Sequence, residues 1–218
     1  MNMHKSVQNL IDIKNKIKSN NQFCNNINII AVSKTFSIDK IKPLIDYGHI
    51  DFGENKVQEA IEKWSKIKVE NSKIKLHLIG KLQTNKVKYA VKIFDYIHSV
   101  DNEKLAKKIS EEQLKNNKNI KIFIQVNIGD EIQKSGISKK DLNKLYQYCL
   151  SLKLDIQGLM CIPPEDQNSD IFFKDLKKMN QNLGLKELSM GMSSDYMLAI
   201  ENSATYVRIG SNIFGKRS

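Results

Sequence analysis

Cysteine is scarce in this chain, and its spacing argues against a disulfide framework. Only Cys24, Cys149 and Cys161 occur among the 218 residues, and no two of them form a C-x-x-C pair. Three cysteines cannot all pair with one another, and structural disulfides are typical of secreted proteins rather than of a reducing compartment. We therefore expect a cytoplasmic protein.

Long apolar runs are also missing. No run approaches the roughly 20 apolar residues that a membrane-spanning helix needs. The first twenty residues are polar and rich in lysine, without the apolar core of a signal peptide. The sequence therefore predicts neither a membrane partner nor a secretory leader.

Arginine is rare, although the chain is strongly basic. Of the 35 Lys and Arg residues, only Arg208 and Arg217 are arginines, and the net charge of +11 would suit a nucleic-acid partner. The lysines are dispersed, however, and no interleaved aromatic platform or zinc-knuckle spacing accompanies them. We therefore expect solvated lysine faces and no nucleic-acid partner, and we expect arginine where a fixed planar donor is needed.

The hydrophobic pattern predicts an alternation of strands and helices. An amphipathic helix covers residues 5–19, and strand-like runs follow at residues 28–33, 50–53, 75–79, 96–100, 121–128, 155–162, 187–192 and 206–209. Helix-compatible segments lie between them at residues 38–47, 56–69, 84–93, 102–115, 139–152, 169–183 and 195–202, and a short last helix starts near residue 213. Eight such units without a composition break favour a closed barrel over an open doubly wound sheet. The expected fold is α/β: a single (β/α)8 TIM barrel over residues 1–218 with an extra N-terminal helix.

Lys34 ends the first strand-like run, and active sites of such barrels lie at the carboxyl ends of the strands. A free lysine has a pKa of about 10.4. It is a poor nucleophile at neutral pH unless burial or a nearby cation lowers that pKa by roughly three pH units. An amine in this place is suited to hold a cofactor through a carbonyl group.

Small residues end the seventh and eighth runs, each directly before a helix. Ser193 follows the seventh run, and Gly210 and Ser211 follow the eighth. Glycine lets the backbone approach an anion, serine adds a hydroxyl donor, and the next helix presents N–H groups. Such residues also make ordinary turns and caps, but the loops after strands seven and eight are where barrels often hold phosphate.

Pyridoxal 5′-phosphate needs an amine for its aldehyde, a phosphate site across the mouth and a fixed donor at its ring nitrogen. We expect Lys34 to form the Schiff base and Arg208 to face the ring nitrogen. Ser193, Gly210 and Ser211 are expected to hold the phosphate, and Asn55 is the candidate donor to the 3-oxygen of the ring.

With these residues in place, the sequence resembles the pyridoxal-phosphate homeostasis protein family, also called the YggS/PROSC family. The matching motifs cover nearly the whole chain: AVSK (31–34), FGENKVQE (52–59), HLIGKLQTNK (77–86), HSVD (98–101), QVN (125–127), KSG (134–136), GLM (158–160), LSMGMS (188–193), VRIG (207–210) and FG (214–215). The sequence departs from the family pattern at Leu76, where an aromatic residue is frequent, and at Ser211, where threonine is frequent. Serine keeps both the hydroxyl and the backbone N–H.

The resemblance implies a fold-type III barrel, like the N-terminal domain of alanine racemase, with Lys34 as the Schiff-base lysine. It implies that the remaining cofactor contacts fall on Asn55, Met192, Ser193, Arg208, Gly210 and Ser211. It further implies a protein of intracellular pyridoxal-phosphate homeostasis, with pyridoxal-phosphate-dependent apoenzymes as partners.

We expect a carrier of the cofactor rather than an enzyme. Arginine has a pKa above 12, so Arg208 donates a hydrogen bond to the ring nitrogen without protonating it, which weakens the ring as an electron sink. The chain ends about where the barrel closes, so we expect no second domain with an opposing acid or base, unless a loop such as residues 129–136 supplies one. The histidines lack metal-ligand partners at a suitable spacing, so we expect no metal site. We also expect a monomer.

Other functions stay open at this point. The first alternative is a small racemase-like enzyme that uses pyridoxal phosphate. The second is a Schiff-base aldolase or phosphosugar barrel in which Lys34 attacks a substrate carbonyl. The third is nucleic-acid binding.

Several polar residues near the strand ends are expected to be structural. His77 and His98 are predicted to make buried hydrogen bonds, and Glu54 and Asp101 to cap the helices that follow them. Lys134 contacts the phosphate, takes part in release of the cofactor, or is an exposed loop lysine.

Overall fold

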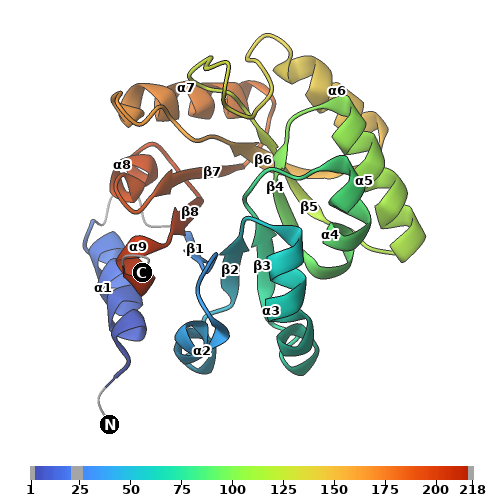
Figure 1. Cartoon of the computed structure of the whole chain (residues 1–218). Coiled ribbons are helices and arrows are strands. Elements are labelled where there is room, and N and C mark those ends of the chain that lie inside the picture. The colour runs from blue at the N-terminus through green and yellow to red at the C-terminus, as the bar shows by residue number, and fades with distance from the viewer. Residues whose placement is uncertain (1–2, 21–26, 216–218) are drawn as a thin grey trace.

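A closed barrel of eight parallel strands forms the centre of the protein (Figure 1). The computed structural model describes residues 3–20 and 27–215. Within them the strands pair in sequence order, and β1 pairs with β8 to close the barrel. The strands are β1 (Asn28–Val32), β2 (Asp51–Glu54), β3 (Lys75–Leu78), β4 (Tyr96–Val100), β5 (Lys121–Gln125), β6 (Asp155–Met160), β7 (Glu187–Met192) and β8 (Tyr206–Ile209).

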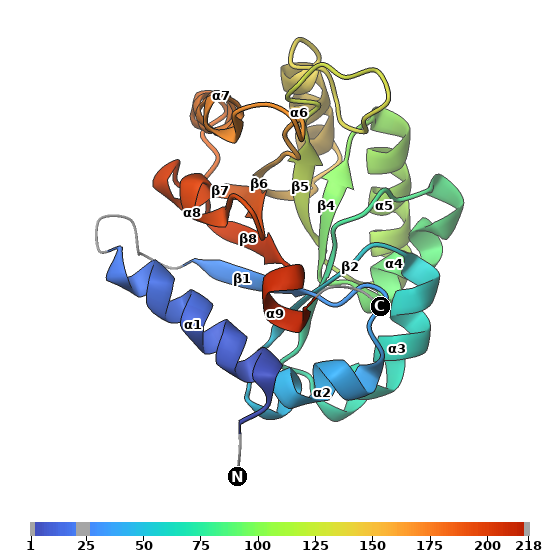
Figure 2. The same ribbon diagram turned by 60° about the vertical axis from the view of Figure 1, so that its left-hand side comes forward.

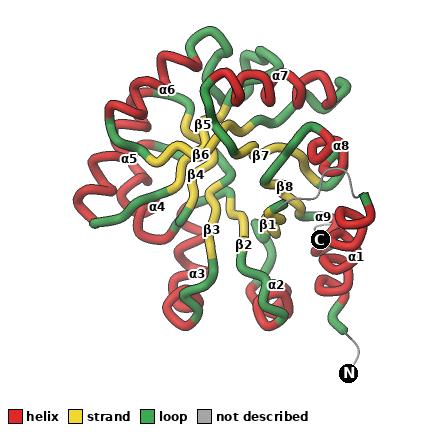
Figure 3. The backbone as a smooth tube through the Cα atoms, turned by 180° about the vertical axis from the view of Figure 1, so that it is seen from behind, coloured by secondary structure: helices red, strands yellow, loops and turns green. Residues whose placement is uncertain are grey.

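Helices alternate with the strands and form a ring around them (Figure 3). They are α1 (Lys5–Ser19), α2 (Ile38–Asp46), α3 (Val57–Glu70), the 3-10 helix η1 (Thr84–Lys86), α4 (Val87–Ile93), α5 (Glu103–Asn116), α6 (Leu142–Ser151), α7 (Ser169–Asn182), α8 (Tyr196–Glu201) and α9 (Ser211–Phe214). The predicted TIM barrel with an extra N-terminal helix is confirmed. None of the helices in the described ranges is both long and apolar enough to cross a membrane. Cys24 and Arg217 lie outside the described residues.

Several predicted bounds differ from the structure by one to three residues; the helix predicted over residues 139–152, for example, begins at Leu142. The helix predicted over residues 84–93 is divided into η1 and α4. The strand predicted over residues 121–128 ends at Gln125, because the loop that follows folds back beside it. Ile137 of this loop donates its N–H to the Gln125 carbonyl at 2.8 Å, so the backbone beyond Gln125 pairs partly with its own loop.

Two apolar layers stabilise the barrel. The larger layer includes Phe52 of β2 and Trp64 of α3, whose ring centroids lie 4.8 Å apart. Successive strand side chains point to opposite faces of the sheet, and a second cluster, separate from the first, consists of Ile30, Tyr96, Phe123, Met160 and Tyr206. The barrel is therefore filled by side chains, as in other barrels of this type.

Helix α1 is packed against α9 and α2, beside the strands that close the barrel (Figure 2). Asn9 Nδ2 donates to the carbonyl oxygen of Ile213 at 2.9 Å, which joins α1 to α9. The apolar face of α1 is buried through Val7, Leu10, Ile13 and Ile17. The N-terminal helix is thus part of the core and supports the C-terminal end of the barrel.

We predict that Leu10→Ala lowers the free energy of unfolding by about 3 kcal/mol, because a fully buried leucine loses its contacts and leaves a cavity. Urea denaturation of the purified protein measures this change. Leu114→Ala is the matched control, because Leu114 is also helical but 81% exposed; it should change stability by no more than about 0.5 kcal/mol. Equal effects of the two changes would show that α1 does not contribute to the core.

Candidate functional site

A pocket of about 610 Å³ opens at the carboxyl ends of the strands. All seven residues predicted for the site line this pocket: Lys34, Asn55, Met192, Ser193, Arg208, Gly210 and Ser211. Sequence reasoning did not assign the other lining residues, Val32, Phe36, Ile79, Ile162, Ser194, Asn212 and Gly215. Val32 and Ile79 lie directly at a strand end, and Ile162 and Ser194 lie two residues beyond one, so the same positional rule would have found these four, whereas Phe36 carries no such signal.

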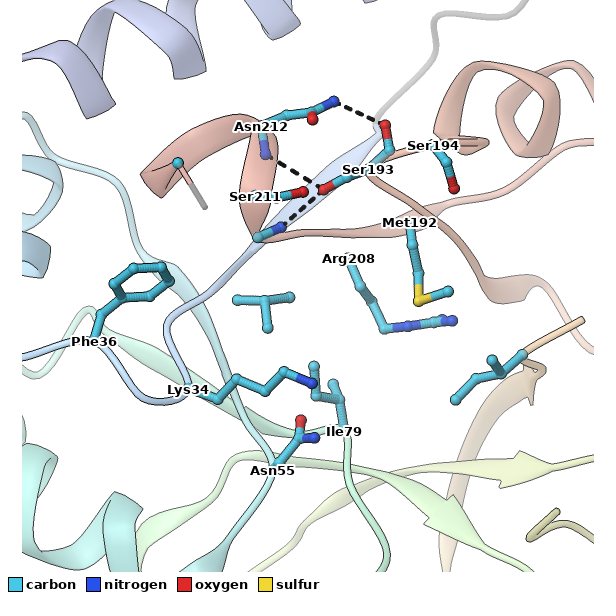
Figure 4. A pocket seen from close by; sticks show the side chains of 14 residues that line it. Lys34, Phe36, Asn55, Ile79, Met192, Ser193, Ser194, Arg208, Ser211 and Asn212 are labelled. Atoms are coloured by element: carbon cyan, nitrogen blue, oxygen red, sulfur yellow. Dashed lines mark hydrogen bonds between the residues drawn. The ribbon is translucent and has the colours of Figure 1, made fainter. Parts of the chain in front are cut away.

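Lys34 enters the pocket from a strained turn after β1. Its side chain points into the pocket with Asn55 beside it and Arg208 across from it (Figure 4). The next residue, Thr35, has a positive φ of 68°, which is uncommon for a β-branched residue and costs about 1–3 kcal/mol. The Thr35 N–H donates to Glu59 Oε1 at 2.6 Å, so a carboxylate of α3 stabilises the turn that directs Lys34.

A buried carboxylate holds the residue before Lys34. Glu54 is fully buried, and its Oε1 accepts hydrogen bonds from Ser33 Oγ at 2.7 Å, Lys63 Nζ at 2.9 Å and Trp64 Nε1 at 2.9 Å. Lys63 Nζ also donates to the Ser33 carbonyl oxygen at 2.9 Å. Ser33 is therefore fixed through both its hydroxyl and its backbone.

Lys63 connects this group to the strained turn. Its ammonium lies 3.0 Å from Glu59 Oε1. Burial acts to raise the pKa of Glu59, but the hydrogen bonds from Thr35 and Lys63 outweigh it and hold that pKa below its ordinary value. Glu59 is therefore ionised at neutral pH. Contacts thus fix the residue before Lys34 through Lys63 and the residue after it through Glu59.

Glycine at position 80 sets the place of Asn55. A side-chain carbon at Gly80 would collide with the carbonyl oxygen and the Cα of Asn55. The backbones of the loops after β2 and β3 are therefore in close contact at Gly80 and Asn55. Asn55 lines the pocket beside this contact.

The turns after β7 and β8 are joined through Ser193. Its Oγ accepts from the backbone N–H groups of Gly210 at 3.3 Å and Asn212 at 3.5 Å, and Asn212 Nδ2 donates to the Ser193 carbonyl at 2.8 Å (Figure 4). Gly191, with a φ of 88°, makes the bend before Ser193. Two N–H groups thus converge on the Ser193 hydroxyl oxygen, and Ser193 and Ser211 both line the pocket; N–H and hydroxyl groups of this kind are the donors that bind phosphate oxygens.

Arg208 forms the inner wall of the pocket. It is only 4% exposed, and its guanidinium donates to Ser189 Oγ at 2.9 Å and to the Cys161 carbonyl oxygen at 2.8 Å. Burial lowers the pKa of Arg208, yet arginine starts so high that the side chain stays charged at neutral pH. The pocket therefore presents a fixed cation on β8 and an amine after β1.

The predicted capping roles of Glu54 and Asp101 are wrong. Glu54 binds Ser33, Lys63 and Trp64, and helix α3 begins without a side-chain cap. Asp101 Oδ2 accepts from the Gly136 N–H at 3.3 Å, while the cap of α5 comes from Asn102. Both carboxylates bind partners elsewhere in the fold instead of the N–H groups that begin the next helix.

The other predictions for polar residues have mixed outcomes. Lys134 does not line the pocket; its Nζ lies 2.6 Å from Glu131 Oε2 and 3.1 Å from the Pro163 carbonyl oxygen. The Lys134 side chain is therefore half-buried, and it binds a carboxylate of its own loop and a carbonyl of the loop after β6. His77 and His98 are buried and hydrogen-bonded to each other at 3.0 Å, as predicted.

Comparison with known proteins assigns the chain to a family. The family model of the alanine racemase N-terminal domain matches residues 8–218. A protein of Aquifex aeolicus named pyridoxal phosphate homeostasis protein is 39% identical over 199 residues, which cover 87% of this chain and 86% of that protein. The chain belongs to the pyridoxal phosphate homeostasis protein family.

Solved structures of the family have the same fold. PipY of Synechococcus elongatus PCC7942 without PLP gives a TM-score of 0.88 at 32% identity and covers 97% of this chain and 100% of PipY. PipY with PLP bound gives 0.84 at 33% identity and covers 96% and 100% of the two chains. An alanine racemase of Clostridium difficile 630, at 14% identity and a TM-score of 0.75, shares the fold over 98% of this chain and 57% of its own.

We predict that Lys63→Met lowers the free energy of unfolding by about 3 kcal/mol, because it leaves the buried Glu54 carboxylate without its cation. Chemical denaturation measures the loss. The control is Lys42→Met: the pair of Lys42 with Asp46 is 68% and 61% exposed and should contribute less than about 1 kcal/mol. If Lys63→Met is as mild as its control, the group around Glu54 does not stabilise the Lys34 turn.

Proposed function

We propose that the protein holds pyridoxal 5′-phosphate as a Schiff base on Lys34 and takes part in pyridoxal-phosphate homeostasis in the cytoplasm, delivering the cofactor to apoenzymes. One observation carries this proposal: an amine, a buried guanidinium and a converging set of N–H and hydroxyl donors line the same pocket at the strand ends. A family relative of the same fold is described with PLP bound, which supports it.

The donor set matches the parts of the cofactor. Lys34 Nζ would hold the aldehyde carbon, and Ser193, Gly210 and Ser211 would hold the phosphate. Arg208 would donate to the ring nitrogen, Asn55 would donate to the 3-oxygen, and Met192 would pack on the ring. When bound, the cofactor supplies an aldehyde that captures amines and a ring that withdraws electrons.

Storage and delivery fit the pocket better than catalysis does. Among the described residues that line it, Lys34 and Arg208 are the charged ones, and none is an acid, a histidine, a tyrosine or a cysteine. Racemisation at an α-carbon by two groups needs a proton acceptor on one face of the substrate and a proton donor on the opposite face. The proposal is therefore a carrier that acts as one domain and as a monomer, and whose bound cofactor is exchanged by incoming amines.

We predict that the purified protein mixed with pyridoxal phosphate stays yellow after the free cofactor is removed, and that borohydride reduction adds the mass of the reduced cofactor to the peptide containing Lys34. Lys34→Ala should lose both signals, because the attachment needs its amine. Lys81→Ala is the control, since Lys81 is an exposed lysine outside the pocket lining. If wild-type protein has no chromophore, or is labelled only at other lysines, the proposal is wrong. A pocket that does not react with pyridoxal phosphate would also favour the aldolase alternative.

We predict no exchange of the α-hydrogen of alanine in deuterium oxide beyond that caused by free pyridoxal phosphate when the loaded protein is present, because Arg208 would leave the ring nitrogen unprotonated and the ring a weak electron sink. Proton NMR of the amino acid follows the exchange over hours. The reference is the same amount of free pyridoxal phosphate. Exchange well above this reference that is abolished by Lys34→Ala would instead identify a racemase-like enzyme.

A further inference from the structure

A continuous chain of hydrogen bonds crosses the barrel interior and ends at Arg208. Asp51 Oδ1 lies 3.1 Å from His77 Nε2, and His77 Nδ1 lies 3.0 Å from His98 Nε2. His98 Nδ1 lies 2.8 Å from Ser189 Oγ, which accepts from Arg208 at 2.9 Å. The chain thus joins side chains of β2, β3, β4, β7 and β8, from the amino end of β2 to the pocket at the other end.

Burial and ring packing keep the members of this chain in place. His77, His98 and Ser189 are fully buried, and Asp51 is 8% exposed. The His77 ring is stacked on Tyr96 at 4.2 Å and the His98 ring on Phe123 at 4.3 Å. Neither imidazole can rotate without breaking this packing, so each ring nitrogen keeps its partner.

When both histidines are neutral and Asp51 is ionised, the two ends of the chain determine the direction of every hydrogen bond in it. Arginine only donates, so Ser189 Oγ accepts from Arg208 and its own hydrogen is left for His98 Nδ1. His98 then carries its hydrogen on Nε2 and donates it to His77 Nδ1. His77 in turn carries its hydrogen on Nε2 and donates it to the Asp51 carboxylate, which only accepts when ionised.

We infer that Asp51, His77, His98 and Ser189 are positioning residues for Arg208, acting as a one-way relay of hydrogen bonds that orients the guanidinium toward the pocket. A cation at one end and a carboxylate at the other polarise the four bonds in the same sense. The orientation of Arg208 follows from the structure alone. Its consequence for the cofactor ring rests on the function proposed above.

One other protonation state would satisfy the geometry. If His77 were an imidazolium, it would donate to both Asp51 and His98, and His98 would then donate from Nδ1 to Ser189. The hydroxyl hydrogen of Ser189 would lose its acceptor in that state. The histidines are also poorly suited to charge: burial lowers the pKa of His77 in spite of Asp51, and it lowers the pKa of His98 well below its ordinary value, with His77 and Arg208 adding to the effect.

The groups around the two rings agree with neutral histidines. The charged residues that act on them are Asp51, Asp95, Lys75 and Arg208, and the neighbouring titratable rings are Tyr96 and Tyr206. Burial raises the pKa of Tyr206 far above neutrality, so this side chain stays neutral. The relay therefore has one net charge at each end and none between them.

The first test uses the protein without cofactor, labelled with nitrogen-15 in histidine. Long-range proton–nitrogen spectra, assigned with His77→Gln and His98→Gln, should show both rings neutral with hydrogen on Nε2 and unchanged from about pH 6 to pH 8. Hydrogen on Nδ1 of His98, or a doubly protonated His77, would overturn the relay. The result does not depend on whether the protein binds pyridoxal phosphate.

The second test connects the relay to the pocket. Asp51→Asn removes the carboxylate charge at the far end of the relay, and Asp51 does not line the pocket. We expect this change to weaken binding of pyridoxal phosphate about tenfold and to shift the visible absorption maximum of the bound cofactor. Asp155→Asn is the matched control, because Asp155 is likewise the first residue of its strand but lies outside the relay. If wild-type protein binds the cofactor and both variants bind it with the same affinity and absorption maximum, the positioning role is refuted. If wild-type protein binds no cofactor, the proposed function fails, but the histidine spectra still show whether the relay exists.

Discussion

The backbone pairing of β1 with β8 is the contact on which the rest of the site depends. Ile30 is in register with Arg208 and Ala31 with Ile209, so strands from opposite ends of the chain lie side by side. Lys34 follows one of these strands and Gly210 the other. Closing the barrel therefore brings Lys34 and Gly210 into the lining of the same pocket, although they are more than 170 residues apart in sequence. The helices α1 and α9 pack together beside this closure.

The pocket owes its chemistry to donors that are held before any ligand arrives. The Lys34 turn is held by Glu59, Ser33 by the buried Glu54, and the Ser193 turn by the backbone of Gly210 and Asn212. Groups that are already oriented lose little entropy when they bind a ligand. The positive φ of Thr35 costs some folding free energy, and it belongs to the turn from which the Lys34 side chain enters the pocket.

Local periodicity predicted most of the fold because each strand and helix shows its buried face in its own sequence. The bounds of α1, β4, β7 and β8 agree with the predicted ranges. The strand-end rule for barrels then located Lys34 and Arg208 without any tertiary information. It could not predict the partners of Glu54 and Asp101, because Lys63, Trp64 and Gly136 reach them only through packing between separate elements. The hydrogen-bonded path from Asp51 to Arg208 could not be predicted either, because it depends on which inward side chains of five strands meet inside the barrel.

The central claim is that pyridoxal phosphate occupies the mouth between β1 and β8, joined to Lys34. A crystal structure of the protein grown with the cofactor tests it most directly. The account predicts continuous electron density from Lys34 Nζ to the former aldehyde carbon, with the phosphate between Ser193 and Gly210 and the ring nitrogen at Arg208. Cofactor density elsewhere on the protein, or density in the pocket with the phosphate turned toward Asn55, would contradict it.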